Sequence, residues 1–180
     1  MSLYALTIPT FTQLLNGLSG QLDKAQAWAE AAGTSVEALM AAQLHDDMLP
    51  LSSQIRFVCG QARDSAGKLT GKTMPPIAED IIALDALKAL IDETQALLAD
   101  LGEDDFAGDE DAMIALTIPN GMTFDLTRYQ YVRDWALPQI YFHATTAYAI
   151  MRHLGVELGK ADYVGHMFRY FRAPQQDAGE

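Results

Sequence analysis

One stretch decides the fold of this chain, residues 132–154, which read VRDWALPQIYFHATTAYAIMRHL. Its apolar and small residues recur at three- and four-residue steps, the spacing that keeps side chains on one face of an α-helix. The members of this stripe are Val132, Ala136, Ile140, His143, Ala147, Ile150 and Leu154. We therefore predict a helix over residues 126–154, kinked at Pro138 and ended by Gly155 in a left-handed conformation.

Two other segments carry the same helical period. The first covers residues 9–32, with an earlier start at Ser2 as the alternative, in which case Pro9 lies inside the helix. The other covers residues 80–101 and is ended by Gly102. Both have an apolar stripe on one face only, so each must bury that face against another element.

A further helix is predicted in the first half of the chain. It begins near Thr34 or Ser35, ends near Gly67 or Gly71, and is bent by Pro50 in its interior. Together with the segments above it gives four amphipathic helices. Such helices bury their apolar faces by forming a four-helix bundle, here one domain over residues 1–180.

The connection between the third and fourth helices contains a predicted β-hairpin. Residues 114–118 and 122–124 alternate in polarity on either side of Pro119-Asn120-Gly121, and Asn-Gly between such runs is a strong hairpin signal. The acidic residues at 103–111 precede it. They lack the ligand spacing of a calcium loop, so we interpret them as a solvated loop.

The composition narrows the partners that this protein can have. Its 180 residues carry 24 acidic and 12 basic side chains, a formal net charge of -12, and no Lys/Arg cluster interrupts the excess. Binding to nucleic acid or to an anionic membrane depends on such a cluster, so both are excluded as partners. The first residues lack the basic start of a secretory signal, and Cys59 is the only cysteine. We therefore expect a cytoplasmic protein with a buried, unreactive thiol.

Two polar residues interrupt the apolar stripes and are candidates for chemistry. Asp47 stands where the second helix is due an apolar residue, and His143 does the same in the fourth. A buried carboxylate needs a partner, so we predict that Asp47 and His143 face each other. Such a pair is either structural, or an acid–base or metal-ligating pair at a pocket. His45, two residues from Asp47, points to a neighbouring face.

Several motifs resemble those of one bacterial family. They are Asp47-Met48-Leu49-Pro50-Leu51, the residues 136–152 (ALPQIYFHATTAYAIMR) and Gly159-Lys160-Ala161-Asp162-Tyr163-Val164-Gly165. With them the chain resembles the domain of unknown function 1993 family, of the DinB-like superfamily of four-helix bundles. The resemblance covers nearly the whole chain and implies an all-α bundle that often forms dimers.

The same resemblance bears on metal binding. Many DinB-like proteins hold a divalent metal with three histidines, one from the second helix and two, one turn apart, from the fourth. By this resemblance His45 corresponds to the first and His143 to one of the pair, whereas Ala147 and Gln139 stand one turn to either side of it. We therefore expect no tightly bound cofactor, with a divalent metal at His45 and His143 as the alternative.

The sequence leaves two functions open. The first is a dimeric small-ligand-binding or structural bundle, with Asp47, His143, His45 and Tyr148 as the candidate pocket. The second is a DinB-like metal-dependent enzyme that transfers a thiol or a similar small nucleophile. The ligand, the substrate and the question of catalysis stay open at this point.

An aromatic C-terminal segment favours the homodimer. An isolated chain rarely leaves a large apolar patch exposed, so we expect these side chains to pack on the bundle or on a second subunit. They are Tyr163, Phe168, Tyr170 and Phe171.

Overall fold

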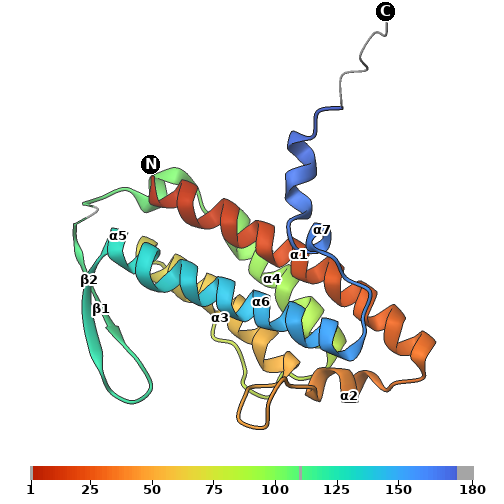
Figure 1. Ribbon diagram of the computed structural model, residues 1–180. Coiled ribbons are helices and arrows are strands. Elements are labelled where there is room, and N and C mark those ends of the chain that lie inside the picture. Colours follow the sequence, from red (N-terminus) through yellow and green to blue (C-terminus); the bar gives the residue numbers. More distant parts are fainter. Residues whose placement is uncertain (1, 110, 174–180) are drawn as a thin grey trace, which may run out of the picture.

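The structure, a computed structural model, describes residues 2–109 and 111–173. Its long helices lie alongside one another as a bundle with their apolar faces turned inward (Figure 1). They are α1 (Leu3–Ala32), α3 (Leu51–Thr70), α4 (Leu84–Ala99) and α6 (Leu137–Leu154). The predicted all-α four-helix bundle with a small hairpin insertion is confirmed.

The helix α1 takes the earlier of its two predicted starts. The Ser2 hydroxyl accepts a hydrogen bond from the Ala5 N–H, which satisfies one of the free donors of the first turn. Pro9 therefore lies inside the helix. Gly33 ends it with φ +65°, a left-handed conformation that glycine adopts without a Cβ penalty.

The second predicted helix is in fact two helices, and the prediction of one bent helix was wrong. The short α2 (Val36–Ala41) is followed by a non-helical segment, residues 42–50, before α3 begins. Pro50 is the N-cap of α3 rather than an interior residue. Proline disfavours helical geometry at the residue before it and lacks the N–H of a helix interior, so it starts the new helix.

Between α3 and α4 the chain has no regular secondary structure, and α4 is shorter than predicted at both ends. After α4 comes the short helix η1 (Glu103–Phe106). The buried guanidinium of Arg128 ties this region to the end of α3, because its Nη2 donates to the carbonyls of Leu69 (2.7 Å) and Phe106 (2.9 Å). These bonds satisfy carbonyls that the helix ends leave free.

The predicted hairpin is confirmed, and it extends from one end of the bundle (Figure 1). The antiparallel strands β1 (Met113–Thr117) and β2 (Thr123–Thr127) pair in register from Met113 with Thr127 to Thr117 with Thr123. In the turn, Gly121 has φ +87° and the Asn120 side chain accepts from the Met122 N–H. Glycine tolerates the positive φ, and the Asn side chain bonds to the backbone two residues on, which is why Asn-Gly is favoured in such turns.

The fourth helix is continuous but contains a wider turn. It consists of α5 (Arg128–Gln130), the π-helical segment η2 (Tyr131–Ala136) and α6. The Leu137 N–H bonds to the Val132 carbonyl, five residues back. Pro138 is the second residue of α6, near the end of the wider turn, and it has no N–H to donate to the helix. Gly155 ends α6 with φ +101°, and Val156 bonds back to the Met151 carbonyl, as predicted.

The C-terminal segment leaves the bundle after α7 (Lys160–Tyr163). It continues as η3 (Gly165–Tyr170), which extends away from the helices (Figure 1). Most of its aromatic side chains face solvent in this single chain, with Phe168 exposed by 68% and Phe171 by 71%. In the described part of the chain, no helix combines the length and the apolarity needed to cross a bilayer.

Candidate functional site

The candidate site is a cleft of about 1040 Å³ along the seam between α3 and α6. Its lining from the fourth helix is a row spaced by four residues: Tyr131, Trp135, Gln139 and His143. Residues at that spacing share one face of a helix, so the row runs along a single line. The facing wall is α3, and residues 74–79 together with the end of β1 form the rim. This volume matches that of pockets for small organic ligands.

The two helices that flank the cleft run antiparallel. His143, near the middle of α6, contacts Gln54 and Phe57 at the start of α3. Tyr131, at the other end of the row, is fully buried, and its hydroxyl lies 3.3 Å from the Ser65 hydroxyl near the end of α3. Burial also raises the pKa of Tyr131, so it is a neutral phenol that fixes this end of the cleft.

His143 is held in one orientation at the other end. Its Nδ1 lies 2.8 Å from Gln54 Oε1, and its ring stacks on Phe57 at 4.8 Å between centroids and 15° between planes. Burial lowers the pKa of His143, which favours the neutral imidazole at pH 7. The ring is therefore uncharged and restrained on two sides.

Gln54 decides which nitrogen of His143 carries the proton. The Gln54 side chain is 2% exposed, and its Nε2 donates to the Leu49 carbonyl at 3.0 Å. Its Oε1 is consequently the atom that faces His143, and an amide oxygen only accepts. We infer that Nδ1 bears the hydrogen and that Nε2 keeps an unprotonated lone pair. A neutral hydrogen-bond acceptor, or base, thus lines the cleft.

Charged groups of both signs also line this cleft. Asp64 and Lys68 lie one turn apart on α3, and the surrounding walls desolvate Asp64 and raise its pKa. Arg63 is buried: its Nε donates to Thr94 Oγ1 at 2.9 Å, and its Nη2 forms an ion pair with Glu93 at 3.1 Å. Arg56, half-buried near His143, donates from Nη2 to Ser53 at 3.1 Å.

The predicted pairing of Asp47 with His143 was wrong. Asp47 lies in the non-helical segment before α3, its side chain is 84% exposed, and its Oδ1 lies 2.6 Å from Nδ1 of His45. The His45 side chain is 72% exposed as well. The break before Pro50 moves both residues off the helical stripe, so the helical periodicity no longer applies to them. Gln54 has the position next to His143 that was assigned to Asp47.

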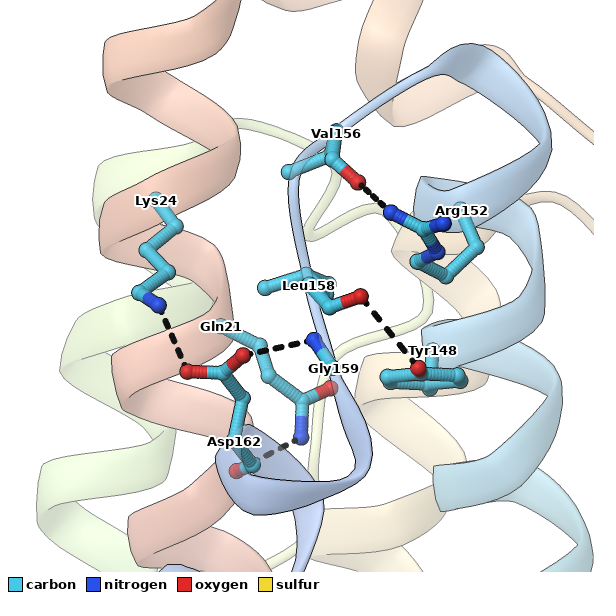
Figure 2. A network of polar contacts seen from close by, with 8 residues as sticks. All are labelled: Gln21, Lys24, Tyr148, Arg152, Val156, Leu158, Gly159 and Asp162. Carbon is cyan, nitrogen blue, oxygen red and sulfur yellow. Dashed lines mark hydrogen bonds and ion pairs between the residues drawn. The ribbon is translucent and has the colours of Figure 1, made fainter.

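Tyr148 lies apart from His143, at the point where the C-terminal segment attaches to the bundle. Figure 2 shows this network, in which the Tyr148 hydroxyl donates to the Leu158 carbonyl at 3.5 Å. Asp162 is its centre: Oδ1 pairs with Lys24 at 2.6 Å, and Oδ2 accepts from the Gly159 N–H at 2.7 Å (Figure 2). The side-chain amide of Gln21 donates to the Asp162 carbonyl. Tyr148 therefore has a structural contact here, outside the cleft lining.

A second hollow of about 800 Å³ lies between α1, the end of α4 and the C-terminal segment. Gly17, Gly20 and Lys24 of α1 are part of its wall. A Cβ at Gly17 would lie 3.3 Å from the Tyr163 carbonyl, so this glycine permits the close approach of α7. The hollow lies where α7 packs on α1, and its polar lining includes Asp162 and Lys24, which pair with each other.

Comparison with known proteins identifies the family of this chain and a solved structure of the same fold. Residues 3–164 match the family described as Domain of unknown function (DUF1993). The chain belongs to this family. A search of the curated proteins gives no match.

The structural comparison agrees with the family. The fold matches a crystal structure of a DinB family member protein from Shewanella denitrificans, with a TM-score of 0.86 and 36% sequence identity over 96% of each chain. This chain and that DinB family member protein thus share one architecture, and the resemblance inferred from the motifs is confirmed.

The three-histidine metal site of many DinB-like proteins does not fit the residues of this DUF1993 chain. Across residues 2–109 and 111–173, no three His, Cys, Asp or Glu side chains form a group suited to a metal ion. One turn beyond His143 is Ala147, which is fully buried and offers no donor atom. His45, the other candidate ligand, is paired with Asp47 on an exposed segment. The donor set therefore lacks two of the expected imidazoles around His143.

Part of the site was missed by the sequence analysis. Gln54, Arg56 and Trp135 were not singled out, although Gln139 was noted as the neighbour of His143. A signal was present in the fourth helix, where residues 131, 135, 139 and 143 recur every fourth position and are polar or aromatic. No corresponding signal marks Gln54, because its role comes from contacts across the bundle.

Proposed function

We propose that this protein binds a small organic molecule in the cleft between α3 and α6, without a metal ion. The observation that carries the proposal is the neutral, oriented His143 at one end of a cleft of about 1040 Å³. Specific ligand pockets combine mostly apolar walls with a few fixed polar groups. The apolar walls here include Phe57, Trp135 and Met74.

The polar groups of the cleft support binding of a ligand that carries its own donor. An acceptor held by Gln54 and by the Phe57 ring loses little freedom when it bonds to a ligand, so less free energy opposes association. The π-helical segment supports the same proposal, because such turns occur often at functional sites and this one contributes Tyr131 and Trp135.

A pair of matched glycine variants tests the location of the ligand. Gly60 lines the cleft, and a Cβ there meets only Ile77 Cδ1 at 4.0 Å, so Gly60→Leu fills the cleft without a backbone clash. Gly20→Leu is the control, since the space around that Cβ is open and Gly20 borders the other hollow. Both replace a helical glycine, which favours the helix.

Ligand-observed NMR with a fragment library supplies the readout. We expect fragments whose saturation transfer is lost with Gly60→Leu and retained with Gly20→Leu. Fragments that behave in the opposite way would place the ligand beside α1 and contradict the proposal. A library without any binder would contradict it as well.

The metal-dependent enzyme is the competing function, and elemental analysis separates the two. We expect protein purified without chelator or affinity-tag metal to hold far less than one equivalent of zinc, nickel or iron. Near one equivalent, lost in His143→Ala, would favour an enzyme that transfers a thiol or a similar small nucleophile. The likeness to a DinB family member protein is what keeps this alternative in view.

We also propose that the protein acts as a homodimer in the cytoplasm. The exposed side chains of the C-terminal segment support self-association, because such a patch is usually covered. They are Met167, Phe168, Tyr170 and Phe171, each exposed by 53% or more. The single thiol, Cys59, is fully buried and its pKa is raised to about 12 by burial, which suits a protein of a reducing compartment.

Light scattering at micromolar concentration tests the dimer. We expect twice 19.7 kDa for the native chain, and a mass of 19.7 kDa for a Phe168→Ser, Phe171→Ser double variant. A native mass of one chain at every accessible concentration would refute self-association. An unchanged double mass in the variant would place the interface elsewhere.

A further inference from the structure

We propose that the cleft selects an aromatic carboxylate and that Arg56 is the residue that pairs with the carboxylate. This inference rests on the proposed ligand-binding function and names the chemistry of the ligand. The supporting observation is that the Arg56 guanidinium makes only one hydrogen bond among the described residues.

Of the three cations that line the cleft, Arg56 and Lys68 lack a carboxylate partner among the described residues, whereas Arg63 pairs with Glu93. Within the described residues, Lys24, Arg63, Lys72, Lys88 and Arg133 each pair with a carboxylate. No Asp or Glu among them lies within 4.0 Å of Arg56, although the chain has 24 acidic and only 12 basic residues. Its one hydrogen bond there runs from Nη2 to Ser53, and its buried Nε has no partner.

The contrast with Arg63, seven residues further along the same helix, shows that the lack of partners is local. Arg63 is 2% exposed, its Nε donates to Thr94 and its Nη1 to the Pro75 carbonyl, and its Nη2, which makes no hydrogen bond, lies 3.1 Å from the Glu93 carboxylate. A buried guanidinium without such partners costs free energy, since its charge is desolvated and uncompensated. Arg63 is therefore part of the fold, whereas half-buried Arg56 has no anionic partner, which an anion in the cleft would supply.

A carboxylate suits this position better than a neutral group. The planar guanidinium offers a fork of N–H donors that matches the two oxygens of a carboxylate. Asp64, the nearest acid along α3 that lines the cleft, stands eight residues from Arg56, about 12 Å along the helix axis. Glu79 lies on the rim. These acids repel a ligand carboxylate and favour its placement at the Arg56 end.

The neighbours of Arg56 specify the rest of the ligand. The Phe57 ring is 44% exposed beside His143, and Trp135 lines the same cleft from the facing helix. Aromatic walls favour a flat ring, because stacked or edge-on rings add to the gain from apolar burial. The unprotonated Nε2 of His143 accepts from a hydroxyl or N–H on that ring.

Matched acid and amide ligands test the proposal. The probes are benzoate and benzamide, 2-naphthoate and 2-naphthamide, and indole-3-acetate and indole-3-acetamide, measured by calorimetry on the full-length protein. In at least one pair we expect the acid to bind about tenfold more tightly than its amide, because charged hydrogen bonds contribute more than neutral ones. Arg56→Gln should reduce that preference to within about twofold and leave amide binding unchanged.

Two further variants make the result specific. Arg56→Lys keeps the charge without the fork and should retain part of the preference, which also guards against a misfolded Arg56→Gln protein. Lys68→Gln removes the cation at the other end of the cleft and should change nothing. A preference lost with Lys68→Gln but kept with Arg56→Gln would overturn the assignment.

The outcomes also separate this inference from the proposed function. If acids and amides bind equally and both are blocked by Gly60→Leu, the cleft binds small molecules but Arg56 does not select a carboxylate. If no member of any pair binds while library fragments still bind in a way that Gly60→Leu blocks, the inference fails and the proposed function stands.

Discussion

The two polar networks along α6 differ in how completely their donors and acceptors are used. At the C-terminal segment, Asp162 uses both carboxylate oxygens and its backbone carbonyl, with Lys24, Gly159 and Gln21 as partners. At the cleft, His143 uses one nitrogen and Arg56 one hydrogen bond. A network whose groups are used holds the fold together, whereas one with spare groups is suited to a ligand.

The largest loss of stability is expected from a change at Gln54, which is buried and hydrogen-bonds to His143 of the cleft. Gln54→Ala leaves the Nδ1–H of His143 and the Leu49 carbonyl without their buried partner. We expect a loss of about 1–3 kcal/mol in the free energy of unfolding, measured with urea.

Gln139→Ala is the matched control for Gln54→Ala. Gln139 lines the same cleft but is half-buried, and no side-chain hydrogen bond from it is seen among the described residues. We expect its change to stay within about 0.5 kcal/mol. Equal losses for both glutamines would show that the Gln54 bridge contributes nothing particular to stability.

The second-largest loss of stability is expected from changes in the network around Asp162. Asp162→Ala removes the Gly159 cap and the Lys24 pair together, and we expect it to cost about 1 kcal/mol. Lys24→Ala should cost less, because its side chain is 53% exposed and exposed ion pairs contribute about 0–1 kcal/mol.

Hydrogen exchange distinguishes a local from a global effect of Asp162→Ala. Faster exchange confined to residues 158–170 would show that this network holds the C-terminal segment alone. Uniformly faster exchange would contradict the separation of the two networks.

The smallest effect is a pH dependence from His143. Burial holds its folded-state pKa below the ordinary value of 6.5, so the unfolded chain binds the proton more readily. The stabilisation is complete above pH 6.5 and decreases as the pH falls from there through the lower folded-state pKa. Stability measured between about pH 7.5 and 5.5 should show this decrease.

Variants isolate the contribution of His143 from that of other groups. The raised pKa of Asp64 acts in the opposite direction and at lower pH, since its folded form holds the proton more strongly. His143→Gln should remove the His143 component, whereas His45→Gln, at an exposed position, should keep it. A pH dependence unchanged by His143→Gln would contradict the burial of this histidine.

Features of this fold that depend on neighbouring residues were predictable from the sequence, whereas features that depend on distant residues were not. The Asn-Gly turn and the Gly155 ending each depend on contacts within a few residues and were predicted, and the Ser2 start was the alternative offered for the first helix. The prediction failed at Pro50, which was placed inside a helix instead of at its start. Because a continuous helix was assumed there, Asp47 was predicted to face the core and to pair with His143. In the structure it lies on an exposed segment.

The sequence by itself determined the helical bundle, the hairpin and the buried place of Cys59, because periodicity and turn residues act locally. The tertiary structure alone decided which side chains meet across α3 and α6. Gln54 orients His143 over a sequence separation of 89 residues. Arg63 hydrogen-bonds to Thr94 on α4, whereas Arg56 has no carboxylate within ion-pair distance among the described residues. Such contacts depend on the relative placement of whole helices, and the spacing of residues within one helix carries no information about it.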